Sequence, residues 1–165
     1  MKISKSMQDA ISAQINAEFQ SAYMYLGMAA SLEEQNFPGM ASWMKKQAEE
    51  EIAHGMKFFD FVFSRQGNIS LPGLKQAKTG WKSPLEVFEA AYSHEQKVTR
   101  LINGLHDLAQ KEKDHATRAF LQWYIQEQVE EEQHANDIVE KIKMIGKSVS
   151  GLLYLDKELG KRMAE

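Results

Sequence analysis

Four long segments of this chain repeat apolar residues at alternating steps of three and four, and a glutamate interrupts each repeat near its middle. This spacing places the apolar residues on one face of a helix, as in the core-facing stripe of a helical bundle. The interrupting residues are Glu18, Glu51, Glu95 and Glu131. A charge on a core-facing stripe must be paired or bound to a metal. The pattern therefore predicts an all-α four-helix bundle with carboxylates in its core.

Residue types that begin and end helices place the boundaries of the first two helices. The first is expected from about Ser4 to Glu34. Proline suits the first turn of a helix, so the second helix is predicted to open one or two residues before Pro38. It is expected to end near Gly67.

The start of the third helix carries the clearest signal. Ser83-Pro84-Leu85-Glu86 combines an N-cap serine, a proline at the first helical position and a capping-box glutamate. Asp114 can cap the fourth helix, and Gly146 is suited to end it. Ser148 or Ser150 can then cap a short, leucine-rich last helix. This helix follows a complete bundle, so its apolar side chains are expected to need a neighbouring subunit.

The segment Gly67–Ser83 is long for a loop in a compact domain. Each main helix should be roughly 40 Å long at ~1.5 Å per residue. The segment can extend to roughly 55 Å at ~3.3 Å per residue, so it can return along the whole bundle. The second and third helices are then parallel, which is the ferritin-like connection. Leu71, Leu74 and Trp81 are expected to pin this crossover to the bundle.

Composition excludes several classes of protein. The chain has no cysteine, which excludes disulfides, thiolate metal sites and a thiol nucleophile. Its net charge of -3 gives no general attraction to nucleic acid or to an anionic membrane. No apolar run resembles a signal peptide or a membrane span, so a cytoplasmic protein is expected. We expect one domain over residues 1–165, with a bundle at about 4–146 and a short helix at about 148–161.

Glu51 and His54 form an E-x-x-H step that places a carboxylate and an imidazole on one helix face. Taken alone, the step is explained by a charged surface, because it follows a run of glutamates. Four carboxylates at similar heights in a core, however, repel one another, and no lysine or arginine lies on the stripes at this level. A bound pair of cations resolves the conflict. Carboxylate and imidazole ligands suit iron and manganese, and they also accept zinc.

The chain resembles the bacterial non-haem ferritins over essentially its full length. The stretches that carry the resemblance are Asn16-Ala17-Glu18, Glu50-Glu51-Ile52-Ala53-His54, His94-Glu95-Gln96, Phe120-Leu121-Gln122-Trp123-Tyr124, Glu127-Gln128-Val129-Glu130-Glu131-Glu132 and Gly151-Leu152-Leu153-Tyr154-Leu155-Asp156-Lys157-Glu158-Leu159. The resemblance implies an iron-storage protein that oxidises Fe²⁺ with dioxygen or peroxide. It also implies a shell of twenty-four subunits that holds the ferric mineral.

The resemblance also implies roles for individual residues. Glu18, Glu51 and His54 are expected to bind a first iron. Glu51 is expected to bridge to a second iron at Glu95 and Glu131. Further implied residues are Gln128 beside the second iron, Tyr25 as a hydrogen-bonding group and electron donor, Trp123 as an outer aromatic, and Glu50, Glu127 and Glu130 as a third, more open iron site.

Several alternatives stay open at this point. Haem is not expected, because Ile52 stands where haem-binding relatives carry a methionine. Glu131 and His134 form a second E-x-x-H step, so His134 is either an extra ligand or a side chain that points aside. A soluble di-iron oxidase or peroxidase without mineral storage is the alternative function. A purely structural bundle is disfavoured by the four glutamates.

Overall fold

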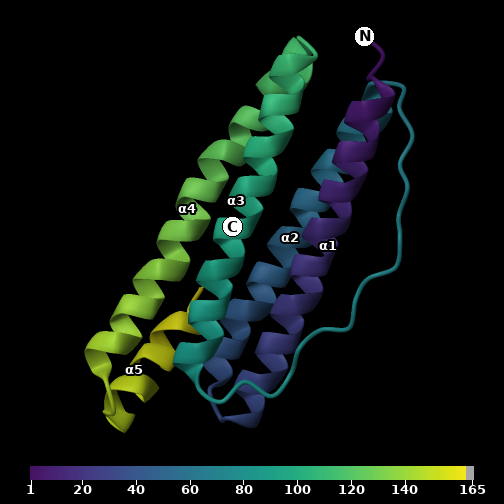
Figure 1. Cartoon of the computed structure of the whole chain (residues 1–165). Helices are drawn as coiled ribbons and strands as arrows, with labels where there is room; N and C mark the ends of the chain where they lie inside the picture. The colour runs from purple at the N-terminus through teal and green to yellow at the C-terminus, as the bar shows by residue number, and fades with distance from the viewer. Residues whose placement is uncertain (163–165) are drawn as a thin grey trace.

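The computed structural model describes residues 1–162, which contain five helices and no strand; residues 163–165 of the predicted domain lie outside the described part. The helices are α1 Lys5–Glu34, α2 Pro38–Ser64, α3 Pro84–Lys111, α4 His115–Ile145 and α5 Val149–Leu159. Figure 1 shows α1 and α2 as one antiparallel pair and α3 and α4 as another. Between the pairs, the chain returns along the whole bundle, so α2 and α3 run parallel. This confirms the ferritin-like bundle with one long crossover and a short fifth helix.

Capping side chains mark the starts of α3, α4 and α5 where the sequence predicts them, whereas α2 begins at Pro38 without a side-chain cap. Ser83 accepts a hydrogen bond from the Glu86 backbone N–H at 3.2 Å, and Asp114 accepts one from Thr117 at 3.0 Å. Ser148, rather than Ser150, caps α5. The expected capping box differs in one bond. The Glu86 carboxylate accepts from the Lys82 N–H at 2.8 Å, one residue before the serine that a capping box uses.

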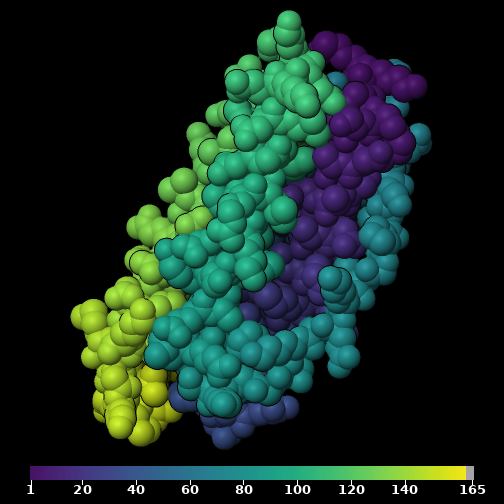
Figure 2. Space-filling view, in the orientation of Figure 1, coloured from purple at the N-terminus to yellow at the C-terminus, as the bar shows by residue number. Residues whose placement is uncertain are grey.

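Polar side chains of α1 hold the crossover more than the expected leucines do. Leu71 and Leu74 remain about half exposed, whereas Trp81 packs against the core. Figure 2 shows the crossover lying along α1. Four backbone N–H groups of the crossover donate hydrogen bonds to side chains of α1. These bonds run from Asn68 to Gln8 at 2.8 Å, from Ser70 to Ser12 at 3.3 Å, from Lys75 to Gln20 at 2.6 Å and from Trp81 to Ser31 at 3.1 Å. These bonds satisfy backbone N–H groups of the crossover, which have no partner within a helix or a sheet.

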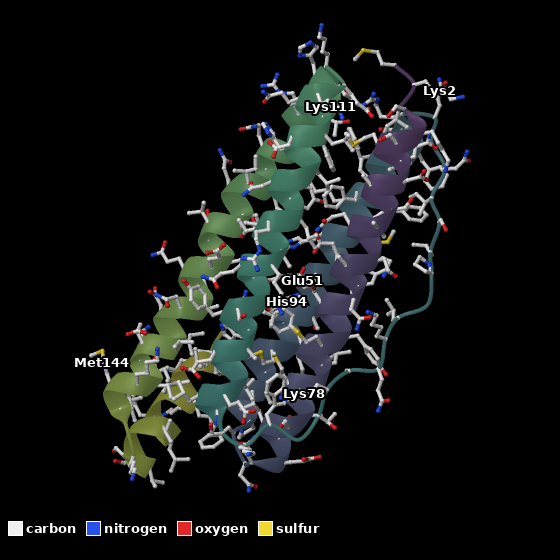
Figure 3. All side chains as sticks on the ribbon, viewed as in Figure 1. Lys2, Glu51, Lys78, His94, Lys111 and Met144 are labelled. Carbon is white, nitrogen blue, oxygen red and sulfur yellow. The ribbon has the colours of Figure 1, made fainter. Side chains whose placement is uncertain are left out.

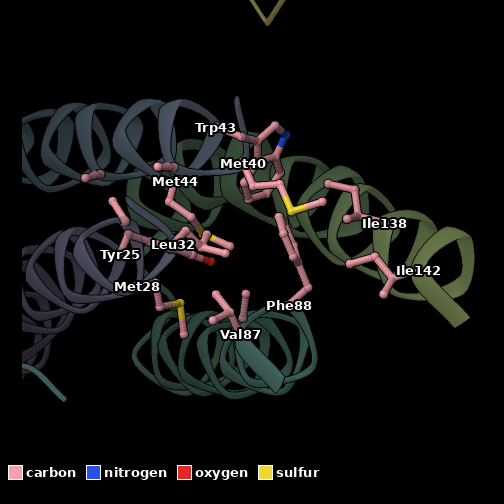
Figure 4. Packing of buried hydrophobic residues seen from close by; sticks show 14 of the residues in the cluster. Tyr25, Met28, Leu32, Met40, Trp43, Met44, Val87, Phe88, Ile138 and Ile142 are labelled. Carbon is pink, nitrogen blue, oxygen red and sulfur yellow. The ribbon is translucent and has the colours of Figure 1, made fainter. Parts of the chain in front are cut away.

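The apolar core is divided into two clusters by a polar level at the middle of the bundle. One cluster lies toward α5 and includes Met28, Met44 and Phe88, which Figure 4 shows packed between the helices. The other lies toward the N-terminus and includes Ile11 and Phe58. Both exclude water from above and below, so the polar side chains at the level between them are buried. None of the five helices in residues 1–162 combines the length and apolar character needed to cross a membrane.

One face of α5 is docked on the chain itself. Leu155 is buried, and the Asp156 carboxylate accepts a hydrogen bond of 2.8 Å from the Met40 N–H in the first turn of α2. A carboxylate at this end of a helix satisfies an unpaired N–H and meets the positive end of the dipole. The opposite face of α5 remains open, with Leu153 and Tyr154 more than half exposed. The expected need for a neighbouring subunit therefore applies to this second face.

The docking of α5 depends on the small size of Gly39. A methyl group there would overlap the carbonyl oxygen of Asp156. We predict that Gly39→Ala lowers the free energy of unfolding by about 1–3 kcal/mol, the usual cost of overpacking. In urea denaturation and hydrogen exchange, the α5 amides should lose protection first.

The matched control is Gly104→Ala on the exposed face of α3. A methyl group at Gly104 meets no described atom within 4 Å, so this change should stabilise the protein by up to about 1 kcal/mol. Equal protection of α5 in the two variants would contradict the docking contact.

Candidate metal centre

Each of the four main helices contributes a buried acidic side chain to the polar level. Glu18, Glu51, Glu95 and Glu131 are between 1% and 4% exposed, although ionised carboxylates are rarely buried without partners. Figure 3 shows Glu51 and His94 close to mid-height in the bundle, and His94 is the residue directly before Glu95. Each of these glutamates lies near the middle of its helix, so the side-by-side packing of the four helices brings them to one level. The structure therefore gathers the four glutamates that the sequence places on separate stripes.

The first half of the centre lies between α1 and α2. Glu18, Glu51 and His54 each offer a ligand atom, and these atoms lie within 4.8 Å of one another. Within the described residues, one carboxylate oxygen of Glu18 and one of Glu51 have no hydrogen-bond partner. A buried acceptor without a partner is costly, and a divalent cation satisfies it. These three residues therefore fit a metal ion.

The second half of the centre consists of the carboxylates of α3 and α4, with hydrogen bonds that fix their orientation. The Tyr25 hydroxyl donates to one oxygen of Glu95, and the Gln128 amide donates to the other at 3.2 Å. Glu131 accepts a hydrogen bond of 2.7 Å from the Gln47 amide. Such outer contacts orient ligands and strengthen metal binding.

The charge states of the centre also favour a cation. Burial, followed by the charges of Glu18 and Glu95, raises the pKa of Glu51 well above its usual value. Burial and the Glu95 charge raise the pKa of Glu131 to about 8. Burial lowers the pKa of His54 to about 4, so its imidazole is neutral at neutral pH and one of its ring nitrogens can bind a metal. Bound cations replace protons on such carboxylates.

The expected third group is only partly assembled. Glu130 is exposed, and Glu50 is paired with Arg162 at 2.6 Å. Glu127 is partly buried, and burial, followed by the charges of Glu130 and Glu50, raises its pKa. Its carboxylate lies within 4.8 Å of ligand atoms of His54 and Glu131. Glu127 thus connects the outer acidic residues to the buried centre.

Three further residues take distinct positions around the centre. Trp123 meets the His54 ring edge-on at 5.3 Å and carries the Lys57 ammonium 3.2 Å above its own ring. Tyr124 donates a 2.7 Å hydrogen bond to the His54 carbonyl, which supports that turn of α2. His134 is exposed and lines a surface cleft with Trp43.

Sequence reasoning missed the roles of Gln47 and Arg162. Gln47 is visible as a polar interruption of the α2 stripe, one turn before Glu51, and this is a usable signal. Arg162 follows the short last helix, and its sequence context gives no indication that it reaches the centre. The guanidinium contacts both Gln47 and Glu50 at 2.6 Å.

Comparisons with known proteins agree with this geometry. The family model of the ferritin-like domain matches residues 8–145. A bacterial non-heme ferritin of Bacteroides fragilis is 43% identical over 97% of this chain and 99% of its own length. One from Staphylococcus haemolyticus is 36% identical over 97% and 96%. The crystal structure of an open pore ferritin from Archaeoglobus fulgidus superimposes with a TM-score of 0.97 at 48% identity, covering 98% of this chain and 100% of that one.

We predict that Glu131→Gln stabilises the metal-free protein increasingly as the pH rises. The pKa of Glu131 rises from 4.5 to about 8 on folding. Between these values the folded protein holds a proton that the unfolded chain releases, so wild-type stability falls with rising pH. Glutamine keeps an acceptor for Gln47 and carries no charge. The difference in Tm between variant and wild type, measured in chelator, should therefore grow from about pH 4.5 to about pH 8 and then level off.

Glu130→Gln is the control, because Glu130 directly precedes Glu131 in α4 and its side chain is exposed. Its effect on Tm should be small across this range. A Tm difference for Glu131→Gln that is the same at pH 5 and pH 8 would contradict the assignment of a raised pKa.

Proposed function

The chain belongs to the ferritin family, and we propose that it stores iron by oxidising Fe²⁺ at the buried centre. In this proposal, each Fe²⁺ loses one electron to dioxygen or peroxide, and Fe³⁺ then passes to a mineral inside a shell of twenty-four subunits. The observation that carries the proposal is the set of buried carboxylates with unpartnered oxygens on Glu18 and Glu51. Anionic ligands stabilise Fe³⁺ more than Fe²⁺, so the same residues that bind the substrate favour its oxidation.

We assign the residues of the chain to two substrate positions. Glu18 and His54 hold the first Fe²⁺, and Glu51 is shared between the two positions. Glu95 and Glu131 hold the second Fe²⁺. The short separation among Glu18, Glu51 and His54 supports the first position, and the aligned hydrogen bonds to Glu95 and Glu131 support the second. Because the two ions are held side by side, one oxidant molecule can take an electron from each of them at the same site.

Tyr25 and Gln128 complete the inner environment by contacts to Glu95. Burial, followed by the charge of Glu95, raises the pKa of Tyr25, which stays protonated and donates to that carboxylate. In the proposed reaction Tyr25 is a further one-electron donor beside the two Fe²⁺: it gives an electron to the oxidant and its hydroxyl proton to Glu95. The tyrosyl radical that remains then regains an electron from a later Fe²⁺ and the proton from Glu95. Gln128 holds the other oxygen of Glu95 during this step.

Iron leaving the centre is proposed to pass through the outer acidic residues. Glu127 lies next to His54 and Glu131, so it is the first carboxylate on the way out. Glu50 and Glu130 extend this group toward the surface and form the proposed third site. The exposed face of α5 supports assembly into a shell, because an open apolar surface is stabilised by contact with other subunits.

The direct test is aerobic addition of Fe²⁺ to metal-free protein, with Glu51→Ala compared to wild type. Glu51 is shared by both positions, so its loss should slow oxidation by more than the roughly tenfold effect of losing an outer contact. The measurement is ferric absorbance against time, followed by sizing of the iron-loaded particle. Wild-type protein should oxidise about two ions per subunit quickly and then continue uptake into a soluble mineral.

The control is Glu49→Ala, because Glu49 is exposed on the same helix and pairs with Lys46. It should oxidise Fe²⁺ at the wild-type rate. Oxidation by wild-type protein that stops at about two ions per subunit would instead indicate a di-iron oxidase without storage. No acceleration over buffer would overturn the function altogether.

Assembly is predicted to depend on the exposed face of α5. Replacing Leu153 and Tyr154 together by lysine should shift the protein from a large particle to small oligomers, because two buried charges oppose the contact. Size-exclusion chromatography with light scattering measures the change. The buried contacts of Leu155 and Asp156 are untouched, so the subunit fold should persist by circular dichroism.

The control for charge is Lys157→Gln, also on the surface of α5. It should leave the particle size unchanged. A full-size shell formed by the double lysine variant would exclude this face from assembly.

A further inference from the structure

The end of the described chain reaches the neighbourhood of the metal centre through one side chain. After α5, Arg162 directs its guanidinium at α2, where it donates to Gln47 Oε1 and Glu50 Oε2 at 2.6 Å each. The same group lies 4.7 Å from the ring centre of Trp43. Two charge-assisted bonds and a stacking contact fix a guanidinium in both position and plane.

Arg162 determines which way the Gln47 amide is turned. A guanidinium has donors and no acceptor, so it must face the amide oxygen of Gln47. The amide nitrogen then points to the other side, where it donates to Glu131 Oε2 at 2.7 Å. Gln47 is 1% exposed, so its amide has little access to solvent water as a substitute partner. Turned around, the amide would present its oxygen to a carboxylate oxygen, which is repulsive.

The contacts from Arg162 through Gln47 to Glu131, here called the relay, have a direct consequence for Glu131. The bond from Gln47 occupies Oε2 of Glu131, and the carboxylate lies within 4.8 Å of ligand atoms of His54 and Glu127. Donation by Arg162 to the amide oxygen also polarises the amide, which strengthens its donation to Glu131. Without Arg162, the amide oxygen of Gln47 loses its donor, so only the bond to Glu131 holds the amide, and the carboxylate is restrained less firmly.

The fold delivers Arg162 to this place by a specific route. Asp156 caps α2 at Met40, and the close approach at Gly39 sets the depth of α5 in the groove beside α2. Gly160 still lies beside Gly39, and from there the side chain of Arg162 reaches Gln47, about two turns along α2 from the cap at ~3.6 residues per turn. The docking of α5 therefore positions the side chain that restrains the centre.

We propose that Arg162 is a positioning residue of the metal centre, which orients Glu131 through Gln47 for binding of the second ion. This inference rests on the proposed function, because it requires Glu131 to be a ligand. It assigns to the C-terminal segment a role in metal binding that is separate from assembly.

The test measures binding of Co²⁺, which does not turn over, to the metal-free full-length protein. Calorimetry gives the affinity for each ion, and the visible spectrum of Co²⁺ reports its coordination. In Arg162→Met, the second ion should bind about tenfold more weakly, the typical cost of losing an outer contact to a ligand. The first ion, held by Glu18, Glu51 and His54, should keep its affinity and its spectrum.

Two further variants separate the relay from other effects. Gln47→Leu removes the amide at similar volume and leaves Glu50 available to Arg162, so it should weaken the second ion equally. The double variant should be no weaker than either single variant, because both remove the same connection. Lys161→Met is the matched control, since Lys161 carries the same charge one residue away and pairs with Glu158 at 2.6 Å.

The outcomes distinguish this inference from the proposed function. Unchanged affinity for the second ion in Arg162→Met, equal weakening of both ions, or additive effects in the double variant would each overturn the relay while the function stands. The same loss of affinity for the second ion in Lys161→Met would mean that the effect comes from net charge alone, and it would also overturn the relay. Wild-type protein that binds no Co²⁺ would overturn both the relay and the function.

Discussion

The mutual repulsion of four buried carboxylates is the constraint on which the rest of the structure depends. Glu18, Glu51, Glu95 and Glu131 lie at one level between two apolar clusters, where water cannot screen their charges. In the absence of cations, burial raises the pKa of all four carboxyl groups, and the charges of neighbouring carboxylates raise it further for Glu51, Glu95 and Glu131, so that bound protons lower the repulsion. The bundle therefore gives up stability to keep four carboxylates that fit a cation, and the apolar clusters supply the stability that holds it together.

The crossover sets the direction in which α3 runs beside the other helices. In a simple up-and-down bundle, α2 and α3 would be antiparallel, and the chain would need only a short loop. Here the chain returns along α1, and a row of polar side chains on that helix satisfies its backbone. At Gly27 a methyl group would come within 2.5 Å of the Lys78 carbonyl oxygen, so the crossover also depends on a close approach to the helix. One face of α1 thus packs in the core, and another face contacts the crossover.

The C-terminal helix has two faces with different tasks. Its buried face docks at the N-terminus of α2 through Asp156 and brings Arg162 to Gln47. Its open face, with Leu153 and Tyr154, is available to other subunits. In the proposed shell, contact between subunits and the orientation of a buried ligand are consequences of the same docked helix.

The sequence by itself determined the helices, their caps and the four carboxylates, because these are local features. Helical spacing places Glu51 and His54 on one face, and Ser83 and Asp114 cap the helices that follow them, whatever the rest of the chain does. The length of the segment before Ser83 was enough to predict the crossover, although the leucines expected to hold it proved largely exposed. The roles assigned to the site residues stay a prediction.

Only the tertiary structure decided which groups support the centre. Gln47 and Arg162 lie far apart in the chain, and their bond depends on how α5 docks on α2. The orientation of Glu131 and the pairing of Glu50 follow from that docking. Sequence spacing fixes which side chains share a helix face, but partners across helices are set by the packing of whole elements, which no local pattern encodes.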